Sequence, residues 1–492
     1  MTGALGRALA DACRDFGAAV ALTGEGGPLR YVQLAERAQA VAARLGDAGL
    51  EANEPVHVSV SNQPPDIAAL FGVWLAGGVA VALHRATPPT LAEALQQRTR
   101  ARFLIDLQAE RGDGSLLSTL SPDLPPRRAL LDGAALIIFT SGSTGAPKGV
   151  VIGHDAFHGK IEQIDTLLRF GSADRVLLVL NLTFGFGLWL SVLALLRGGT
   201  LVMSPRFEPE AFLHTLAAER VTRVGMVPTM MRMVFADRRH AEAIDGVAQQ
   251  GRLAQILIGG ESLGQSLAEA IRARFSPTEL VDIYGLTETS TCDFFAFAAD
   301  AARYPGCIGR PSPQVRHRIV DAQGHAVAAG AVGELQISSP YLMNGYLDDP
   351  PLTGAAYCEA WFKTGDLARE ADGQVVMLMG RLKEVISRGG NKVTPVEIEQ
   401  ALCAHADVAA AMAVGVADAV LGERIHALIV PRAGASLDPG ALREHLASRL
   451  ERFKHPDAWH LADALPLGRT GKADRGEFKR LIESGAMVPT PG

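Results

Sequence analysis

The chain has 492 residues, and its 53 Asp and Glu residues outnumber its 47 Lys and Arg residues, giving a formal net charge of −6. A dedicated nucleic-acid binder normally carries a basic excess, so this balance argues against that class. The length predicts more than one domain, and the proportions of apolar residues (48%) and charged residues (20%) exclude wholesale disorder.

The cysteines and the N-terminal segment bear on the compartment. The five cysteines are scattered along the chain and include no CxxC pair: Cys13, Cys292, Cys307, Cys358 and Cys403. They support neither a disulfide framework nor a zinc cluster, and we expect a reducing, cytoplasmic location. The first 17 residues carry charges and have no apolar core, so no signal peptide is expected.

Strand and helix patterns alternate through the N-terminal half. The spacing predicts a helix over 34–45, a strand over 55–61, a helix over 65–79 and a strand over 79–83. Further strands are predicted at five apolar segments, 136–139, 175–179, 200–203, 223–227 and 255–258. This repetition predicts an α/β fold in which helices cover parallel sheets.

One uncharged segment, 176–196, is long enough to cross a bilayer. It contains Asn181 and Thr183 together with glycines at 185 and 187, and Arg197 follows it. We therefore expect a buried strand, a turn at 181–187 and a buried helix over 188–197, and no membrane span.

The pattern changes in the C-terminal third. Short strands joined by glycine-containing turns are predicted at 315–321, 333–338 and 373–379, which indicates a β-rich subdomain. The last hundred residues predict a small α+β unit, with a helix at 395–403, strands at 408–415 and 425–431, and a helix at 438–450.

The segment from Phe139 to Gly149, FTSGSTGAPKG, follows an apolar run and predicts a loop that leaves a strand. Closely spaced backbone N–H groups, hydroxyls and a lysine suit the oxygens of a polyphosphate. It is not a Walker A loop, because Ala146 and Pro147 separate the last glycine from the lysine. The candidate phosphate ligands are Thr140, Ser141, Gly142, Ser143, Thr144, Gly145 and Lys148.

A second group of candidates follows a strand predicted over 280–283. Tyr284 stands at the strand end, where its ring can stack on an adenine or can simply be a core residue. Thr287 can contact the α-phosphate. Glu288 suits a Mg²⁺ ion on a triphosphate, because Mg²⁺ prefers oxygen ligands, although a solvated surface glutamate is the alternative.

Asp366 follows Gly365 in what we expect to be a tight turn. A carboxylate there can accept both ribose hydroxyls, as the acidic residue of dinucleotide folds does. A turn aspartate without a ligand is the alternative explanation.

The loop at 139–149 resembles the phosphate loop of the adenylate-forming (acyl-activating) superfamily, which includes acyl- and aryl-CoA ligases, peptide-synthetase adenylation domains and firefly luciferase. Five more segments resemble motifs of that superfamily in the same order. They are Gly259–Gly260–Glu261, YGLTET at 284–289, KTGD at 363–366, GRLK at 380–383 running through 387–391 to Glu397, and PLGRTGK at 466–472. The resemblance covers essentially the whole chain and is strongest to acyl- or aryl-CoA synthetases.

The resemblance implies a large ATP- and carboxylate-binding domain at 1–382 and a small mobile domain at 384–492, with the hinge at Lys383. It implies that Asp366 is the ribose ligand with Arg381 close by, and that Lys472 bridges the carboxylate and the α-phosphate in the adenylation transition state. Gly260, Glu261 and Gly285 are the further nucleotide-site candidates. Rotation of the small domain would withdraw Lys472 and bring the loop 387–391 to the site, where Arg388, Gly389 and Gly390 line a thiol tunnel.

The implied reaction uses MgATP and a carboxylic acid to make an acyl-adenylate and pyrophosphate, after which a thiol forms a thioester. We expect coenzyme A as the acceptor, and the phosphopantetheine arm of a carrier protein is the alternative. A luciferase-like oxidoreductase and a non-catalytic sensor are the readings from other classes, and retention of both Glu288 and Lys472 weighs against the sensor. The sequence leaves the oligomeric state open.

One segment departs from the superfamily pattern. Phe184 stands where CoA ligases often carry a histidine, and Gly185 stands where peptide synthetases hold the substrate amine with an aspartate, which disfavours α-amino acids. The candidates for the acyl pocket are mostly apolar or small and favour an aromatic or aliphatic acid. They are Phe184, Phe186, Met230, Met231, Gly260, Gly285 and Ser290.

Overall fold

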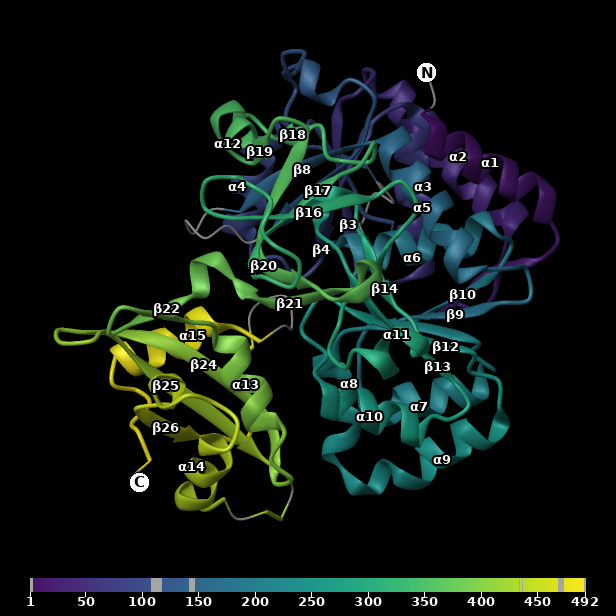
Figure 1. The fold of residues 1–492 in the computed structure, drawn as a ribbon. Helices are drawn as coiled ribbons and strands as arrows, with labels where there is room; N and C mark the ends of the chain where they lie inside the picture. The colour runs from purple at the N-terminus through teal and green to yellow at the C-terminus, as the bar shows by residue number, and fades with distance from the viewer. Residues whose placement is uncertain are drawn as a thin grey trace.

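The computed structural model describes residues 3–107, 117–140, 147–432, 434–435, 437–467 and 473–490. It has the predicted α/β architecture, with a large N-terminal domain built on three sheets and a smaller C-terminal domain built on a fourth (Figure 1). The two domains meet where β21 (Val376–Arg381) packs beside α13 (Pro395–Cys403).

The largest sheet has nine strands in the order β15-β14-β13-β12-β11-β9-β10-β1-β2. Its strands are β1 (Val20–Thr23), β2 (Leu29–Arg30), β9 (Arg175–Leu178), β10 (Thr200–Met203), β11 (Arg223–Met226), β12 (Gln255–Gly259), β13 (Glu279–Tyr284), β14 (Phe294–Ala296) and β15 (Arg310–Pro311). The run from β1 to β13 through β10, β9, β11 and β12 is parallel, as predicted, and β14 pairs antiparallel with β13. The carboxyl ends of the parallel strands therefore share one edge, which is where such sheets place ligands.

The seven-stranded sheet has the order β18-β8-β7-β4-β3-β5-β6. Its strands are β3 (Pro55–Val60), β4 (Val79–His84), β5 (Phe103–Ile105), β6 (Leu117–Thr119), β7 (Ala134–Thr140), β8 (Lys148–Gly153) and β18 (Gly345–Tyr346). Its strands β3, β4, β5 and β7 pair parallel, as predicted, whereas β7 and β8 pair antiparallel. Too few residues separate these strands for a parallel crossover. Lys148, which we expected in a loop, is consequently the first residue of β8.

Helices cover the faces of the two large sheets (Figure 1). Those of the N-terminal domain are α1 (Ala4–Phe16), α2 (Tyr31–Asp47), α3 (Pro64–Ala76), α4 (Pro89–Thr99), α5 (His154–Leu168), α6 (Gly185–Leu196), α7 (Pro209–Ala218), α8 (Pro228–Ala236), α9 (Ala241–Gln250), α10 (Gln265–Arg274), α11 (Ala298–Arg303) and α12 (Pro350–Ala355). The uncharged segment 176–196 forms the predicted buried strand, turn and helix, as β9 and α6. Within the described residues, every helix is too short or too polar to cross a membrane.

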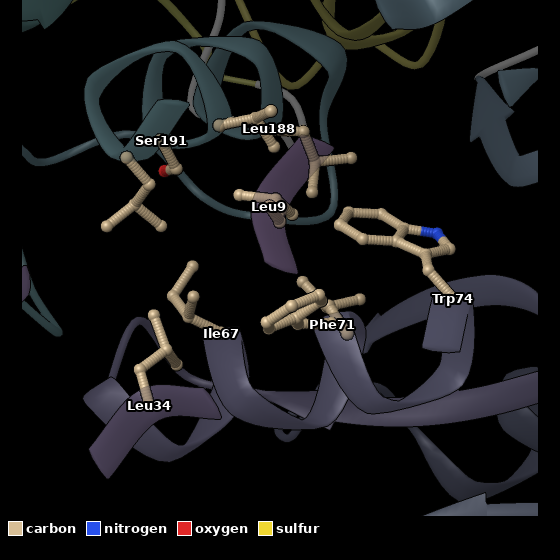
Figure 2. A pocket seen from close by; sticks show the side chains of 10 residues that line it. Leu9, Leu34, Ile67, Phe71, Trp74, Leu188 and Ser191 are labelled. Carbon is tan, nitrogen blue, oxygen red and sulfur yellow. The ribbon is translucent and has the colours of Figure 1, made fainter. Parts of the chain in front are cut away.

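A small cavity lies between α1, α2, α3 and α6, with Leu9, Ile67, Phe71 and Leu188 among its lining side chains (Figure 2). The Ser191 hydroxyl beside it already donates to the carbonyl of Gly187 at 2.7 Å. Its volume of about 10 Å³ has room for about one water molecule, so it is a packing defect and not a place for a substrate.

The third sheet is antiparallel and contains β16 (Arg316–Val320), β17 (Gly333–Ser338), β19 (Tyr357–Cys358), β20 (Trp361–Glu370) and β21. The strand predicted at 373–379 starts late, because Gly373 adopts a left-handed conformation (φ 70°) in a 3-10 turn. Asp366 does not lie in a tight turn as expected. It lies inside the ten-residue strand β20, next to a bulge at Gly365, whose φ of 71° suits glycine.

The C-terminal domain has its own sheet and hydrophobic core. Its strands are β22 (Ile386–Arg388), β23 (Asn391–Val393), β24 (Val408–Asp418), β25 (Gly422–Pro431) and β26 (Ala458–Leu461), and its helices are α13, α14 (Pro439–Ala447) and α15 (Arg475–Glu483). The two helices and two strands predicted for this region are confirmed. All five cysteines of the chain lie in described segments and are free.

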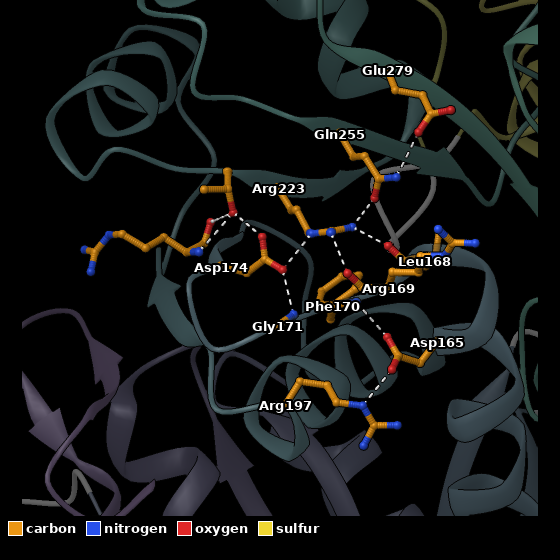
Figure 3. A network of polar contacts seen from close by, with 12 residues as sticks. Asp165, Leu168, Arg169, Phe170, Gly171, Asp174, Arg197, Arg223, Gln255 and Glu279 are labelled. Carbon is orange, nitrogen blue, oxygen red and sulfur yellow. Dashed lines mark hydrogen bonds and ion pairs between the residues drawn. The ribbon is translucent and has the colours of Figure 1, made fainter.

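A polar network joins the amino ends of the parallel strands, at the edge opposite the candidate site (Figure 3). Arg223, the first residue of β11, pairs with Asp174 at 3.0 Å, donates to the carbonyls of Leu168 (2.8 Å) and Arg169 (2.9 Å), and lies over the Phe170 ring. We expect this network to stabilise the fold, because it joins the start of β11 to the loop before β9, about 50 residues earlier in the sequence.

Replacing Arg223 with methionine should lower the free energy of unfolding by about 3 kcal/mol, because the substitution removes the positive charge that pairs with the largely buried Asp174 carboxylate. Urea denaturation followed by tryptophan fluorescence measures the loss. Arg303→Met is the matched control, since Arg303 and Asp372 form an exposed pair whose removal should cost less than about 1 kcal/mol. Equal losses in the two variants would contradict a structural role for the network.

His57 on β3 is buried, and its ring is 2.8 Å from the Thr99 hydroxyl. Burial lowers the pKa of His57 from 6.5 to about 4, so the folded state favours the neutral ring. The resulting stability is complete above the unfolded-state pKa and is lost as the pH falls from 6.5 towards 4. Between pH 7.5 and pH 5 the free energy of unfolding should fall by about 2 kcal/mol less in His57→Gln than in the wild type. Urea denaturation at both pH values measures this difference. An unchanged pH dependence would contradict this assignment.

Candidate functional site

Predicted site residues gather where β12 and β13 end. Gly260 and Glu261 directly follow β12, and Gly260 has a φ of 85°, which favours glycine. Tyr284 ends β13, and Gly285 follows it so closely packed that a Cβ atom there would lie 2.2 Å from the backbone nitrogen of Cys292. The structure therefore explains both glycines by backbone crowding and conformation, without reference to a ligand.

Tyr284, Asp366 and Arg381 form one hydrogen-bonded unit that links the nine-stranded sheet to the third sheet. The Tyr284 hydroxyl donates to Oδ2 of Asp366 at 2.6 Å, and Nε of Arg381 lies 2.9 Å from Oδ1. Asp366 and Arg381 are opposite each other on β20 and β21. Burial raises the pKa of Asp366, and the Arg381 guanidinium acts in the opposite direction. Three residues predicted from separate motifs are thus brought together.

Tyr284 is mostly buried, with its ring set edge-on to Phe294 at a centroid distance of 5.9 Å. Burial raises its pKa well above the usual value, so the phenol remains a hydrogen-bond donor. The core explanation for this tyrosine therefore holds in part, while its stacking on an adenine stays a prediction.

The side chain of Tyr346 interacts with both Glu288 and Lys148. The Tyr346 hydroxyl donates to Oε1 of Glu288 at 2.9 Å, and Nζ of Lys148 is 5.3 Å from the centre of the Tyr346 ring. Glu288 and Thr287 lie on a short 3-10 helix, Thr287–Thr289, that is anchored when the Met343 N–H donates to the Glu288 carbonyl at 2.9 Å. A candidate phosphate ligand and a candidate metal ligand therefore share one surface.

Tyr346 was not predicted as a site residue. Burial raises its pKa, and the adjacent Glu288 carboxylate adds to the effect. Its contact with Glu288 spans 58 residues of sequence, so no local pattern could have indicated it.

Glu261 is held by α8. Oε2 accepts from the Thr229 hydroxyl at 2.7 Å and lies 3.4 Å from Nη1 of Arg232. Oε1 is buried and has no hydrogen-bond partner among the described residues. The carboxylate is thus fixed on one side and retains acceptor capacity on the other, and neither Thr229 nor Arg232 was predicted from the sequence.

The acyl-pocket candidates fall into different environments. Phe184 precedes α6, and Phe186, in the first turn of that helix, stacks on Trp189 at 5.3 Å with the rings nearly parallel. Met230 is partly buried and contacts both large cores. Met231 is fully buried, so in this structure it has no surface with which to contact an acid. Ser290 is also buried, and its hydroxyl has no partner among the described residues.

In the C-terminal domain, Lys383 lies on a 3-10 turn, Leu382–Glu384, between β21 and β22. Gly389 and Gly390 form the turn between β22 and β23 with φ values of 56° and 81°. Arg388 pairs with Asp457, with Nε 2.9 Å from Oδ2, so its guanidinium is held within its own domain. The predicted roles of these residues in a hinge and a thiol tunnel stay predictions.

Two predicted elements fall outside the described residues: Ser141, Gly142, Ser143, Thr144 and Gly145 of the phosphate loop, and Lys472. The described residues that flank each of these segments pair with one another. Thr140 pairs with Lys148 across β7 and β8, and Leu467 forms an isolated bridge with Ala473.

Comparison with known proteins gives matches over both domains. The family model for AMP-binding enzymes matches residues 9–347, and the model for the AMP-binding enzyme C-terminal domain matches residues 397–472. An indoleacetate–CoA ligase from Aromatoleum aromaticum is 30% identical over 482 residues, covering 92% of this chain and 93% of the relative. ScoC, a fatty acid–[acyl-carrier-protein] ligase from Streptomyces coeruleorubidus, is 29% identical over 484 residues, covering 92% of each chain.

A solved structure supports the same architecture. ATP-bound MatB from Rhodopseudomonas palustris superposes with a TM-score of 0.86 at 24% identity, covering 98% of this chain and 99% of that chain. The two matched family segments fall on the two domains described above.

Proposed function

Because the chain belongs to the AMP-binding enzyme family, we propose that it activates a carboxylic acid with MgATP, releasing pyrophosphate, and transfers the acyl group to the thiol of coenzyme A. The observation that carries this proposal is the meeting of Tyr284, Asp366 and Arg381 at the carboxyl edge of the large sheet. The similarity to a CoA ligase along nearly the whole chain supports the same assignment.

In this proposal Asp366 accepts the ribose hydroxyls. A carboxylate offers about four lone-pair sites, and the bonds from Tyr284 and Arg381 use two of them. Gly260, Glu261, Tyr284 and Gly285 border the adenine. Thr140, Lys148 and the segment 141–145 hold the β- and γ-phosphates, and Thr287 contacts the α-phosphate.

The proposed metal is Mg²⁺, with Glu288 as its protein ligand. The described residues contain no group of three or more His, Cys, Asp or Glu side chains arranged around a metal. The donors present fit Mg²⁺ nonetheless, because this ion is commonly held by one or two carboxylates together with substrate phosphates and waters. When bound, it would neutralise phosphate charge, and Glu288 would orient the triphosphate for attack at the α-phosphorus.

We propose domains at 1–382 and 384–492 that rotate about Lys383. In the first step Lys472 stabilises the charge that develops on the α-phosphate as the acid oxygen attacks and pyrophosphate leaves. In the second, the loop with Arg388, Gly389 and Gly390 replaces Lys472, and the thiol displaces AMP. The ion pair between Arg475 and Glu384 (3.1 Å) supports this division, because it ties the start of α15 to the residue that follows the hinge.

Phe184, Phe186, Met230 and Ser290 are the proposed contacts for the acid. An apolar lining favours an aromatic or aliphatic acid. Position 185 is glycine and offers no carboxylate for a substrate amine, which disfavours α-amino acids. A carrier-protein phosphopantetheine is the second candidate for the acceptor, supported by the match to ScoC.

The decisive measurement is pyrophosphate release with MgATP across aryl, short, medium and long acids, each with and without CoA. Release that turns over only with CoA and one class of acid would establish the proposed ligase and name its substrate class. A single burst that CoA does not change would indicate a held adenylate and a carrier protein as the acceptor. No release with any acid would refute the activity.

A further inference from the structure

A fully buried ion pair contacts the 3-10 helix Thr287–Thr289 through its carboxylate. Lys160 on α5 and Asp293, just before β14, have side chains with 0% exposure, and Nζ lies 2.8 Å from Oδ1. They are separated by 133 residues, and neither belongs to the nucleotide-site candidates. Burial raises the pKa of the Asp293 carboxyl, and the Lys160 ammonium opposes that shift.

Asp293 also closes the loop that begins at Tyr284. Its second carboxylate oxygen accepts from the Thr289 hydroxyl, and its N–H donates to the Tyr284 carbonyl at 2.7 Å. The Thr289 hydroxyl in turn contacts the Leu286 carbonyl at 3.0 Å. Asp293 thus bonds the start of the loop through its backbone N–H and the 3-10 helix that carries Thr287 and Glu288 through its carboxylate.

The same loop contains a strained segment. Ser290, Thr291 and Cys292 have φ values of 57°, 78° and 43°, and non-glycine residues with positive φ cost on the order of 1 kcal/mol each. Three in a row persist only where surrounding contacts hold them. Asp293 is the next residue, and its bonds to Thr289 and Tyr284 contribute to that constraint, together with the backbone bonds from Ser290 to Thr287 and from Thr291 to Leu286.

A buried ion pair is a weak source of stability, because the desolvation of two charges offsets most of their attraction. A buried pair can instead fix one geometry, and here the Asp293 carboxylate is also hydrogen-bonded by the Thr289 hydroxyl. We propose that Lys160 and Asp293 are positioning residues, which hold the turn so that Thr287 and Glu288 face the triphosphate during adenylation. This inference rests on the proposed function for its kinetic consequence, although the constraint on the loop does not.

The test compares Lys160→Met with the double variant Lys160→Met/Asp293→Leu. The single variant leaves a buried carboxylate unpaired and should be the less stable of the two. The double variant has a neutral core again and should recover most of the lost melting temperature. Its kcat for pyrophosphate release should still fall about 10- to 100-fold, with the KM for MgATP changed less than about threefold.

A purely structural role predicts a different result, in which activity returns together with the melting temperature. Hydrogen–deuterium exchange of the peptide covering 284–293 gives a second readout, which should be faster in the double variant at matched stability. Because hydrogen–deuterium exchange needs no substrate, it tests the constraint on the loop even if the wild type activates no acid. Unchanged exchange, or a double variant within twofold of wild-type kcat, overturns the proposal.

If the double variant does not fold, Thr289→Val and Thr289→Ser replace it. Valine removes the hydroxyl that Asp293 accepts from, whereas serine keeps it, so exchange and kcat should change with valine and recover with serine. Equal behaviour of the two overturns the proposal. Glu162→Gln is the matched control, because Glu162 is also on α5 and pairs with Arg197 at 2.8 Å, away from the loop, and this change should leave kcat and exchange unaltered.

Discussion

Replacing Lys472 with alanine should lower the rate of pyrophosphate release about 100-fold or more, while thioester formation from a supplied acyl-adenylate stays within about threefold of the wild type. The first effect arises because the proposed attack places negative charge on the α-phosphate oxygens. The Lys472 ammonium would stabilise this charge mainly in the transition state. The second follows because the thiol step begins after pyrophosphate has left.

The residues around this position support delivery of Lys472 by the C-terminal domain as one body. Ala473 forms a bridge with Leu467, and the Asp474 N–H donates to the Pro466 carbonyl at 2.9 Å, so the base of the loop is closed. Arg475 pairs with Glu399 at 2.6 Å as well as with Glu384. Movement of the sheet and α13 would therefore carry the base of this loop with them.

Rapid-quench measurement of both half-reactions tests the assignment. Lys472→Arg should retain little adenylation activity, since a forked guanidinium does not substitute for a compact ammonium at a single oxygen. Lys479→Ala is the control on α15, because Lys479 is partly exposed, lies 3.9 Å from Glu423 and should leave both steps unchanged. Undiminished adenylation by Lys472→Ala would show that another group stabilises the transition state.

Local patterns predicted much of the fold. Alternating apolar segments gave the parallel strands β9 to β13, and the helix predicted at 395–403 matches α13. The errors concern how strands pair. The short connection between β7 and β8 makes an antiparallel hairpin in a region whose alternation predicts parallel strands, and Asp366 is drawn into a long strand by pairing with β17 and β21.

The same limit applies to the site. Motif order predicted Tyr284, Asp366 and Arg381, and the structure joins them. Motif order could not predict Tyr346 or Lys160, because the first contacts Glu288 and the second pairs with Asp293, each across a long stretch of chain. A residue that works by holding another has no chemical signature of its own in a sequence.

The second large effect is expected for Asp366→Asn, which should reduce kcat/KM for MgATP about 100-fold in the adenylation step. The carboxylate now accepts from Tyr284 on one oxygen and faces Arg381 on the other. An amide presents a donor on one side, so one of these two donors must face an NH₂ group. The variant also loses the charge that would strengthen the proposed bonds to the ribose hydroxyls, and charge-assisted bonds contribute about 1.5–3 kcal/mol each.

Tyr284→Phe separates these causes. It keeps the ring against Phe294 and removes only the hydroxyl, so we expect about a tenfold loss or less, since Asp366 retains its charge and its Arg381 partner. Melting temperatures of both variants distinguish loss of nucleotide recognition from loss of fold, because the pair also joins two sheets. If Asp366→Asn stayed within about threefold of the wild type with an unchanged KM for MgATP, the carboxylate would be a structural link between the sheets and the ribose would be held elsewhere.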